Sequence, residues 1–315
     1  MTITTADDAE LRAAYQLCRQ VAQQHGRTYF LATRLLPAER RSATHALYAF
    51  ARTVDDIVDV DATATAAAEL AAIEHQLRDL IESGTDPVGV HRPVLIAVVD
   101  TIERFDIAPQ YFWSFFESMR MDLPGTAEFR SRYATMADLR LYTHGSAAVI
   151  GLQMLPVLGT VVPIEEAVVP AAALGEAFQL TNFIRDVGED LDRGRVYLPA
   201  DELAAFDVDD ALLLHCKKTG TLDRRVRRAL AHFAAVNRSI YREARPGIDM
   251  LDRRVRPGIR AAFTLYAGIL ESVERNDFHV LDRRAVVPRS RRLSVASPEL
   301  LRALAARRPS ERHNR

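Results

Sequence analysis

Three aspartates lie within five residues of one another in the string YAFARTVDDIVD, which covers positions 48–59. Apolar residues recur around them at helical spacing, so the string predicts a helix. Asp55 and Asp59 are four residues apart and therefore share one face of that helix. Like charges at this spacing cost a helix about 0.2–0.5 kcal/mol, so the pair indicates either a bound cation or a well-solvated face.

A second acidic cluster lies in QLTNFIRDVGEDLDRGRVYLP, residues 179–199. Asn182, Asp186 and Asp190 are spaced four and four, so they form one polar stripe on a predicted helix whose other side is apolar. Carboxylate and amide oxygens are the hard ligands that Mg²⁺ prefers, and Mg²⁺ completes its shell with water and phosphate oxygens. Two such helices facing each other would hold Mg²⁺ around a diphosphate and neutralise it as a leaving group.

Arginines accompany both acidic clusters. Arg52 lies one turn before Asp55, and Arg185, Arg193 and Arg195 lie within or just after the second cluster. Guanidinium groups bind phosphate oxygens bidentately and keep their charge, although pairing with the neighbouring carboxylates is the alternative role. Either cluster alone is equally well explained as a solvated helix face, but their shared spacing and apolar backs favour a site.

The bulk properties fit a globular enzyme. The chain has 315 residues, a formal net charge of −1 and 48% hydrophobic residues, so it can form one large helical domain or two ordinary ones. Near-neutral charge excludes a general nucleic-acid binder. Cys18 and Cys216 lie far apart and form no CxxC, so we expect a reducing cytosol and neither a disulfide framework nor a zinc site. The polar, acidic N-terminus is unlike a signal peptide.

Helical periodicity extends over most of the chain, without strand alternation, internal repeats or a long linker. We therefore predict an all-α fold with a single domain over residues 1–293 and a loosely ordered basic tail over residues 294–315. The apolar stretch 147–164 is long enough for a short membrane span. Its Gln153, Pro156 and Pro163 instead favour a helix buried inside a bundle.

The C-terminal segment is rich in arginine and contains SPELLRALAARR, which predicts a short amphipathic helix. Anionic lipid attracts basic segments. We expect a cytoplasmic protein that associates peripherally with the inner face of the membrane through this tail. The alternative is a disordered, solvated tail.

Three strings resemble the squalene/phytoene synthase family: HGRTYFLATRLLPAERRSATHALYAFARTVDDIVD at 25–59, LGEAFQLTNFIRDVGEDLDRGRVYLP at 174–199, and the weaker FHVLDRRAVVPRSRRL at 278–293. The resemblance implies a single-domain helical bundle of the isoprenoid synthase type with a central cavity. It also implies Mg²⁺-dependent, head-to-head joining of two allylic diphosphates through a cyclopropylcarbinyl diphosphate, with Mn²⁺ as the alternative ion. The strings most resemble bacterial members that make phytoene from two geranylgeranyl diphosphates without NADPH.

The resemblance also implies roles for individual residues. The metal ligands would be Asp55, Asp59, Asn182, Asp186 and Asp190. The diphosphate contacts would be His25, Arg27, Arg52, Arg185 and Arg283. Tyr142, Gln179 and Tyr266 would lie at the reaction centre, where the tyrosines are close to the leaving group or the cation. For Tyr142 and His25 the alternatives are an ordinary core tyrosine and a helix-surface histidine.

One string departs from the family pattern, and three other functions stay open. Where many members have a tyrosine followed by VAGxVG, this chain has YTHGSAAVIG at 142–151, which puts the role of Tyr142 in doubt. A squalene or dehydrosqualene synthase acting on farnesyl diphosphate is the nearest alternative, and the squalene type needs NADPH. A terpene cyclase and a non-catalytic binding or assembly module are more remote.

Overall fold

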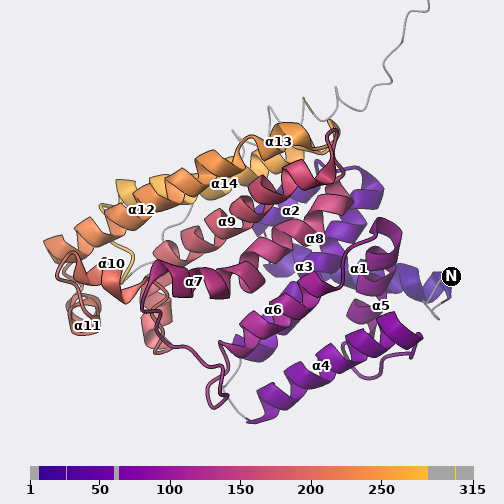
Figure 1. The fold of residues 1–315 in the computed structure, drawn as a ribbon, viewed down its shortest axis with the longest axis horizontal. Coiled ribbons are helices and arrows are strands. Elements are labelled where there is room, and N and C mark those ends of the chain that lie inside the picture. The colour runs from indigo at the N-terminus through magenta and orange to yellow at the C-terminus, as the bar shows by residue number, and fades with distance from the viewer. Residues whose placement is uncertain (1–6, 26, 60–63, 283–301, 303–315) are drawn as a thin grey trace, which may run out of the picture.

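The computed structural model describes residues 7–25, 27–59, 64–282 and 302, and it confirms the predicted all-α class (Figure 1). Within these residues there is no strand, only two isolated bridges that pair Arg132 with Val196 and Thr160 with Leu251. The helices are α1 (Asp8–His25), α2 (Arg27–Thr33), α3 (Ala38–Asp59), α4 (Ala64–Ser83), α5 (Arg92–Phe105), α6 (Gln110–Arg120), α7 (Met136–Thr143), the π-helix η1 (His144–Ala148), α8 (Val149–Leu158), α9 (Ile164–Asp192), α10 (Ala200–Ala204), α11 (Asp210–Thr219), α12 (Arg224–Ala244), α13 (Gly247–Met250) and α14 (Arg256–Arg275). The predicted tail, 294–315, lies outside the described residues apart from Arg302.

Helix α3 carries the first acidic cluster and is held by α1, α4, α5, α6 and α8. Its Phe50 is fully buried against three aromatic rings of α6, with centroids 5.5 Å from Phe112 and 5.7 Å from Phe116. Burying rings of this size contributes much of the local stabilisation. Since Phe50 faces the core, the rotation of α3 is fixed, and with it the face that carries Asp55 and Asp59.

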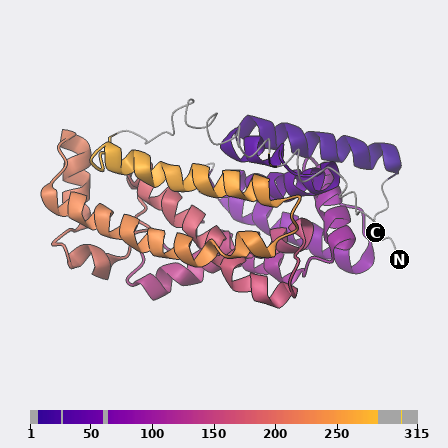
Figure 2. The same cartoon turned by 90° about the horizontal axis from the view of Figure 1, so that it is seen from above.

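Helix α9 carries the second cluster and packs against α8, α12 and α14. Figure 2 shows α12 and α14 side by side along the length of the molecule. A buried hydrogen-bond network fixes the register of α9 against α12. Thr181 Oγ1 lies 2.8 Å from the Tyr241 hydroxyl, and Asn237 Nδ2 donates to Thr181 Oγ1 at 2.8 Å. The next residue, Asn182, lies roughly 100° further around α9 and does not share the face that Thr181 turns toward α12.

Helices α7, η1 and α8 follow one another without a break. Helix α8 packs against both α3 and α9, the two helices that carry the acidic clusters. Glycines allow close approach here. A Cβ at Gly145 would lie 2.1 Å from the Ser114 carbonyl oxygen, and one at Gly175 would lie 2.2 Å from the Ala147 carbonyl oxygen. The segments Met136–Leu158 and Ile164–Asp192 are each long and apolar enough to cross a membrane, yet both pack as central helices of the bundle.

Candidate active site

The two predicted acidic faces line one polar pocket between α3 and α9. Its lining includes nine of the predicted site residues: Arg52, Asp55, Asp59, Tyr142, Gln179, Asn182, Arg185, Asp186 and Asp190. Asn182 Nδ2 donates to Gln179 Oε1 at 3.3 Å, so this bond leaves the amide oxygen of Asn182 available to a cation. Residues that are more than 120 positions apart in the chain therefore share one site.

The carboxylates of this pocket repel one another in a poorly solvated space. Burial, with a further contribution from Asp59, raises the pKa of Asp55 to about 7. Burial and the neighbouring Asp186 likewise raise the pKa of Asp190 to about 7. Raised carboxyl pKa values are common where several acids are clustered at a functional site, such as a cation-binding site without its cation. The cluster would become fully ionised at a lower pH if positive charge were bound among these groups.

The arginines pair with the acids in the structure. Arg185 forms a bidentate pair with Asp186 through Nε, 2.7 Å from Oδ1, and Nη2, 2.5 Å from Oδ2. Arg193 Nη1 donates to Asp59 across the pocket at 3.2 Å. Arg185 and Arg193 therefore show the alternative role expected for these arginines, which is pairing with neighbouring carboxylates.

Arg52 combines a paired and an unpaired nitrogen. Its Nη2 pairs with Asp56, one turn further along α3, whereas its buried Nε has no hydrogen-bond partner among the described residues. A buried donor without an acceptor is costly. An anionic ligand bound in this pocket would satisfy it.

An apolar cavity lies along α9, on the N-terminal side of the residues that line the polar pocket. It is lined by α8, α9, α13 and α14. Phe178 lines the apolar cavity and the next residue, Gln179, lines the polar pocket, so α9 borders both spaces through neighbouring residues. The apolar stretch 147–164, expected to be a helix buried inside a bundle, contributes one wall of this cavity through Ile150, Met154 and Leu158.

Four predicted residues lie outside the lining of the polar pocket. Tyr266 of α14 stacks on Phe178 at 4.2 Å between centroids and 17° between planes, so it supports the apolar cavity. His25 is exposed at the end of α1. Arg27 begins α2, but its side chain is not among the described ones, and Arg283 lies outside the described residues. Their predicted roles stay predictions.

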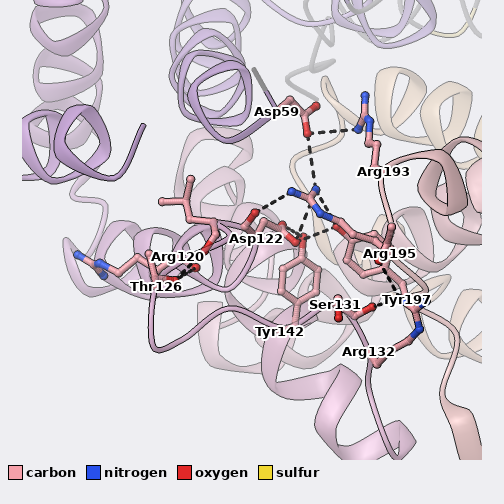
Figure 3. Close-up of polar contacts among 12 residues, drawn as sticks. Asp59, Arg120, Asp122, Thr126, Ser131, Arg132, Tyr142, Arg193, Arg195 and Tyr197 are labelled. Carbon is pink, nitrogen blue, oxygen red and sulfur yellow. Dashed lines mark hydrogen bonds and ion pairs between the residues drawn. The ribbon is translucent and has the colours of Figure 1, made fainter. Parts of the chain in front are cut away.

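Sequence reasoning missed two pocket residues, Asp122 and Tyr197 (Figure 3). Asp122 follows α6 in the string DLPGT, which reads only as a turn, and Tyr197 follows the second acidic cluster. Both tyrosines beside Asp122, Tyr142 and Tyr197, donate their hydroxyl protons to its carboxylate. Burial raises the pKa of the Asp122 carboxyl, and Arg195 opposes this rise.

The donor set of the pocket fits Mg²⁺ bound together with a diphosphate. Among the described residues, no three His, Cys, Asp or Glu side chains already converge on one point as a ready metal cage. Mg²⁺ rarely uses such cages, because it binds one or two carboxylates and takes its other oxygens from water and substrate phosphates. Acids on two helices and the unpartnered Nε of Arg52 suit that arrangement.

A helical bundle in which two acidic helices enclose a polar pocket, with an apolar cavity along one of them, defines the isoprenoid synthase class. The family model described as squalene/phytoene synthase matches residues 22–291, and the chain belongs to this family. It is 37% identical over 304 residues to a phytoene synthase of Arthrospira platensis, covering 92% of this chain and 93% of the relative. It is 36% identical over 309 residues to a 15-cis-phytoene synthase of Synechocystis sp., covering 94% and 87%.

Solved structures agree with the family assignment. A crystal structure of a dehydrosqualene synthase in complex with a ligand superposes with a TM-score of 0.81 at 27% identity, covering 95% of this chain and 99% of that one. A squalene synthase of Alicyclobacillus acidocaldarius superposes with a TM-score of 0.73 at 24% identity, covering 88% and 99%. The second likeness shows the shared fold.

Proposed function

We propose that this chain condenses two molecules of geranylgeranyl diphosphate head to head to form phytoene, releasing two diphosphates. The observation that carries the proposal is that α9 borders an acidic pocket at Gln179 and an apolar cavity at the preceding residue, Phe178. A polar and an apolar space along one helix match a substrate with a charged head and a long hydrocarbon chain. The high identity to phytoene synthases over nearly the whole chain supports the product.

The reaction divides into two ionisations. In the first, diphosphate leaves C1 of one substrate, the double bond of the second attacks the allylic cation, and loss of a proton closes a cyclopropane ring. In the second, the remaining diphosphate leaves, the carbon skeleton rearranges, and loss of a second proton forms the central double bond. No reductant enters this balance, so NADPH is not required.

The residues of the pocket have separate tasks in this proposal. Mg²⁺ would neutralise the departing diphosphate, and Asp55, Asp59, Asn182, Asp186 and Asp190 would hold it. Arg52 and Arg185 bind and orient the diphosphate oxygens. The apolar walls exclude the water that would otherwise capture a carbocation. The predicted tail and Arg283 add peripheral membrane binding and a further diphosphate contact, in a cytoplasmic protein.

The test is an incubation of the purified chain with either geranylgeranyl or farnesyl diphosphate, with Mg²⁺ or EDTA, and with or without NADPH. Extracted hydrocarbons are identified by mass spectrometry. We expect phytoene from geranylgeranyl diphosphate, no dependence on NADPH and no product in EDTA. Squalene formed only with NADPH would place the chain in the farnesyl-using branch, and cyclic products from one diphosphate would overturn the proposal.

A further inference from the structure

Asp122 is a buried carboxylate at the wall of the polar pocket, with 4% of its surface exposed. Tyr142 donates its hydroxyl proton to Oδ2 at 2.5 Å, and Tyr197 donates to Oδ1 at 2.8 Å. Arg195 Nη2 donates to the backbone carbonyl of Asp122 at 2.7 Å, and its Nη1 lies 3.9 Å from Oδ1 (Figure 3). Two other segments of the chain, one with Tyr142 and one with Arg195 and Tyr197, are thus tied to Asp122.

The direction of these hydrogen bonds determines whether this wall of the pocket offers donors or acceptors to a ligand. A phenol has one proton to donate, and its oxygen also accepts. Because Tyr142 gives its proton to Asp122, its oxygen can only accept any further interaction. Tyr197 is in the same state, and it accepts a long bond from Arg195 Nη1 at 3.4 Å. Of the two phenol oxygens, that of Tyr142 is therefore the one with lone pairs left for a ligand.

Aromatic rings surround the same point. Phe183 stacks on Tyr197 at 4.2 Å between centroids and 9° between planes, and the Tyr142 ring lies 5.4 Å from Tyr197. All three rings line the pocket. Aromatic faces attract positive charge, and more strongly when water is excluded. A diphosphate gains nothing from a wall of acceptors, whereas a carbocation does.

We propose that Asp122 is a positioning residue that keeps the hydroxyl proton of Tyr142 turned away from the substrate, so that the oxygen and ring of Tyr142 stabilise the developing allylic cation. The inference rests on the proposed function and assigns Tyr142 to the cation, where the family resemblance left the leaving group as an equal choice. Asp122 itself makes and breaks no bond in the reaction. Tyr197 and Arg195 hold Asp122 in place.

The decisive variant is Asp122→Asn, which keeps the side-chain shape but replaces one acceptor oxygen by a donor NH₂. One of the two tyrosines then loses its acceptor, and donors point toward the cation. We expect kcat for phytoene formation to fall on the order of 10²-fold, as when one preorganised electrostatic contact is lost. KM for geranylgeranyl diphosphate and the Mg²⁺ concentration for half-maximal rate should stay within about threefold, because ground-state binding is unchanged.

Tyr142→Phe removes the oxygen but keeps the ring, and it should lower kcat in the same way. If Asp122 acts through Tyr142, the double variant Asp122→Asn/Tyr142→Phe should be little worse than the more damaged single variant. Full additivity of the two losses would contradict the inference.

Tyr133 offers a matched control. Its ring lies 5.6 Å from Tyr142 and 5.9 Å from Tyr197, so it belongs to the same aromatic cluster. Its buried hydroxyl has no hydrogen-bond partner in the described part of the chain, and its side chain does not line the pocket. Tyr133→Phe should therefore leave kcat within about twofold of the wild-type value, since no interaction is lost.

Two results for Asp122→Asn would overturn the inference. The first is a raised KM or a raised Mg²⁺ requirement with little change in kcat, which would assign Asp122 to the diphosphate site. The second is a near-normal kcat with an unchanged KM. If Asp122→Asn does not fold, as judged by near-UV circular dichroism, then Tyr142→Phe and Tyr197→Phe carry the test, and unchanged kcat in both would overturn it. Failure of the proposed function would show earlier, as wild-type protein that makes no hydrocarbon from geranylgeranyl diphosphate.

Discussion

Arg185 and Asp186 are neighbours on α9 and are joined by two hydrogen bonds, Nε to Oδ1 at 2.7 Å and Nη2 to Oδ2 at 2.5 Å. The proposed roles send these two groups to different partners, Arg185 to the diphosphate and Asp186 to Mg²⁺. Binding of a magnesium diphosphate would thus exchange one ion pair for two. Because both side chains line the pocket, they can turn toward a ligand bound there by side-chain rotation.

This relationship predicts a severe defect in Asp186→Asn. The substitution removes a charged ligand, keeps the shape and leaves Arg185 without its anion. Losing one ligand of a leaving-group metal should cost several kcal/mol in the transition state, about a 10²-fold or larger drop in kcat. Steady-state turnover of geranylgeranyl diphosphate at limiting Mg²⁺ is the measurement.

Asp192→Asn is the control for this variant. Asp192 lies at the end of the same helix, pairs with Lys217 at 2.5 Å, and is absent from the lining of the polar pocket. Turnover of Asp192→Asn should stay close to wild type, because a surface ion pair contributes at most about 1 kcal/mol. Equal turnover of the Asp186 and Asp192 variants would rule out a metal role for Asp186.

The raised pKa of Asp190 predicts a pH-dependent stability of the metal-free protein. This carboxyl has an ordinary pKa of 3.8 and a folded-state pKa of about 7, so the folded state binds the proton more tightly. Protonated Asp190 therefore contributes its full stabilisation of the folded state below about pH 4, and this contribution is lost as the pH rises toward 7. A shift of this size corresponds to about a few kcal/mol.

Thermal unfolding in EDTA, measured for the wild type and for Asp190→Asn from pH 5 to 8, tests this sign. The variant cannot ionise at this position, so its stability should increase relative to that of the wild type as the pH rises. A difference between the two proteins that is independent of pH would show that Asp190 is not the group that titrates. Bound Mg²⁺ should reduce the pH effect, since it favours the ionised carboxylate.

Two helical glycines predict opposite stability effects. A Cβ at Gly175 would lie 2.2 Å from the Ala147 carbonyl oxygen, so Gly175→Ala must push α9 away from η1 and α8. Overpacking of this kind costs about 1–3 kcal/mol. A Cβ at Gly268 would meet nothing within 4 Å, so Gly268→Ala should stabilise α14 by up to about 1 kcal/mol. Urea unfolding midpoints should move in opposite directions, and a stabilised Gly175→Ala would contradict the close packing.

The sequence was informative about the acidic helices because their chemistry is local. The spacing of Asp55 and Asp59, and of Asn182, Asp186 and Asp190, follows from helical geometry alone. That α3 and α9 line one pocket was an inference from the matching spacing, and the structure confirms it.

Other parts of the site depend on long-range packing and leave no local pattern. Asp122 is a single aspartate in a turn, and its tyrosine partners are 20 and 75 residues away. Tyr266, expected at the reaction centre with Tyr142, stacks on Phe178 because α14 packs against α9. Spacing within one helix could not show this contact, and the role of Tyr266 at the reaction centre stays a prediction. Which residues face each other across a bundle is decided by helix contacts rather than by spacing within one helix.

The basic tail gives the last prediction. Substrate and product are both hydrophobic, and each Lys or Arg near an anionic surface contributes about 1 kcal/mol to membrane attraction. Deleting residues 294–315 should therefore weaken sedimentation with anionic vesicles and spare turnover in detergent. Arg283→Ala should do the reverse and lower turnover in detergent, because its expected partner is the diphosphate. Neutral vesicles provide the control, since they should bind the full chain and the truncated chain equally weakly. If the truncated chain still sediments with anionic vesicles as well as the full chain does, the tail is not the membrane-binding element, and a surface of the helical domain must supply the attraction.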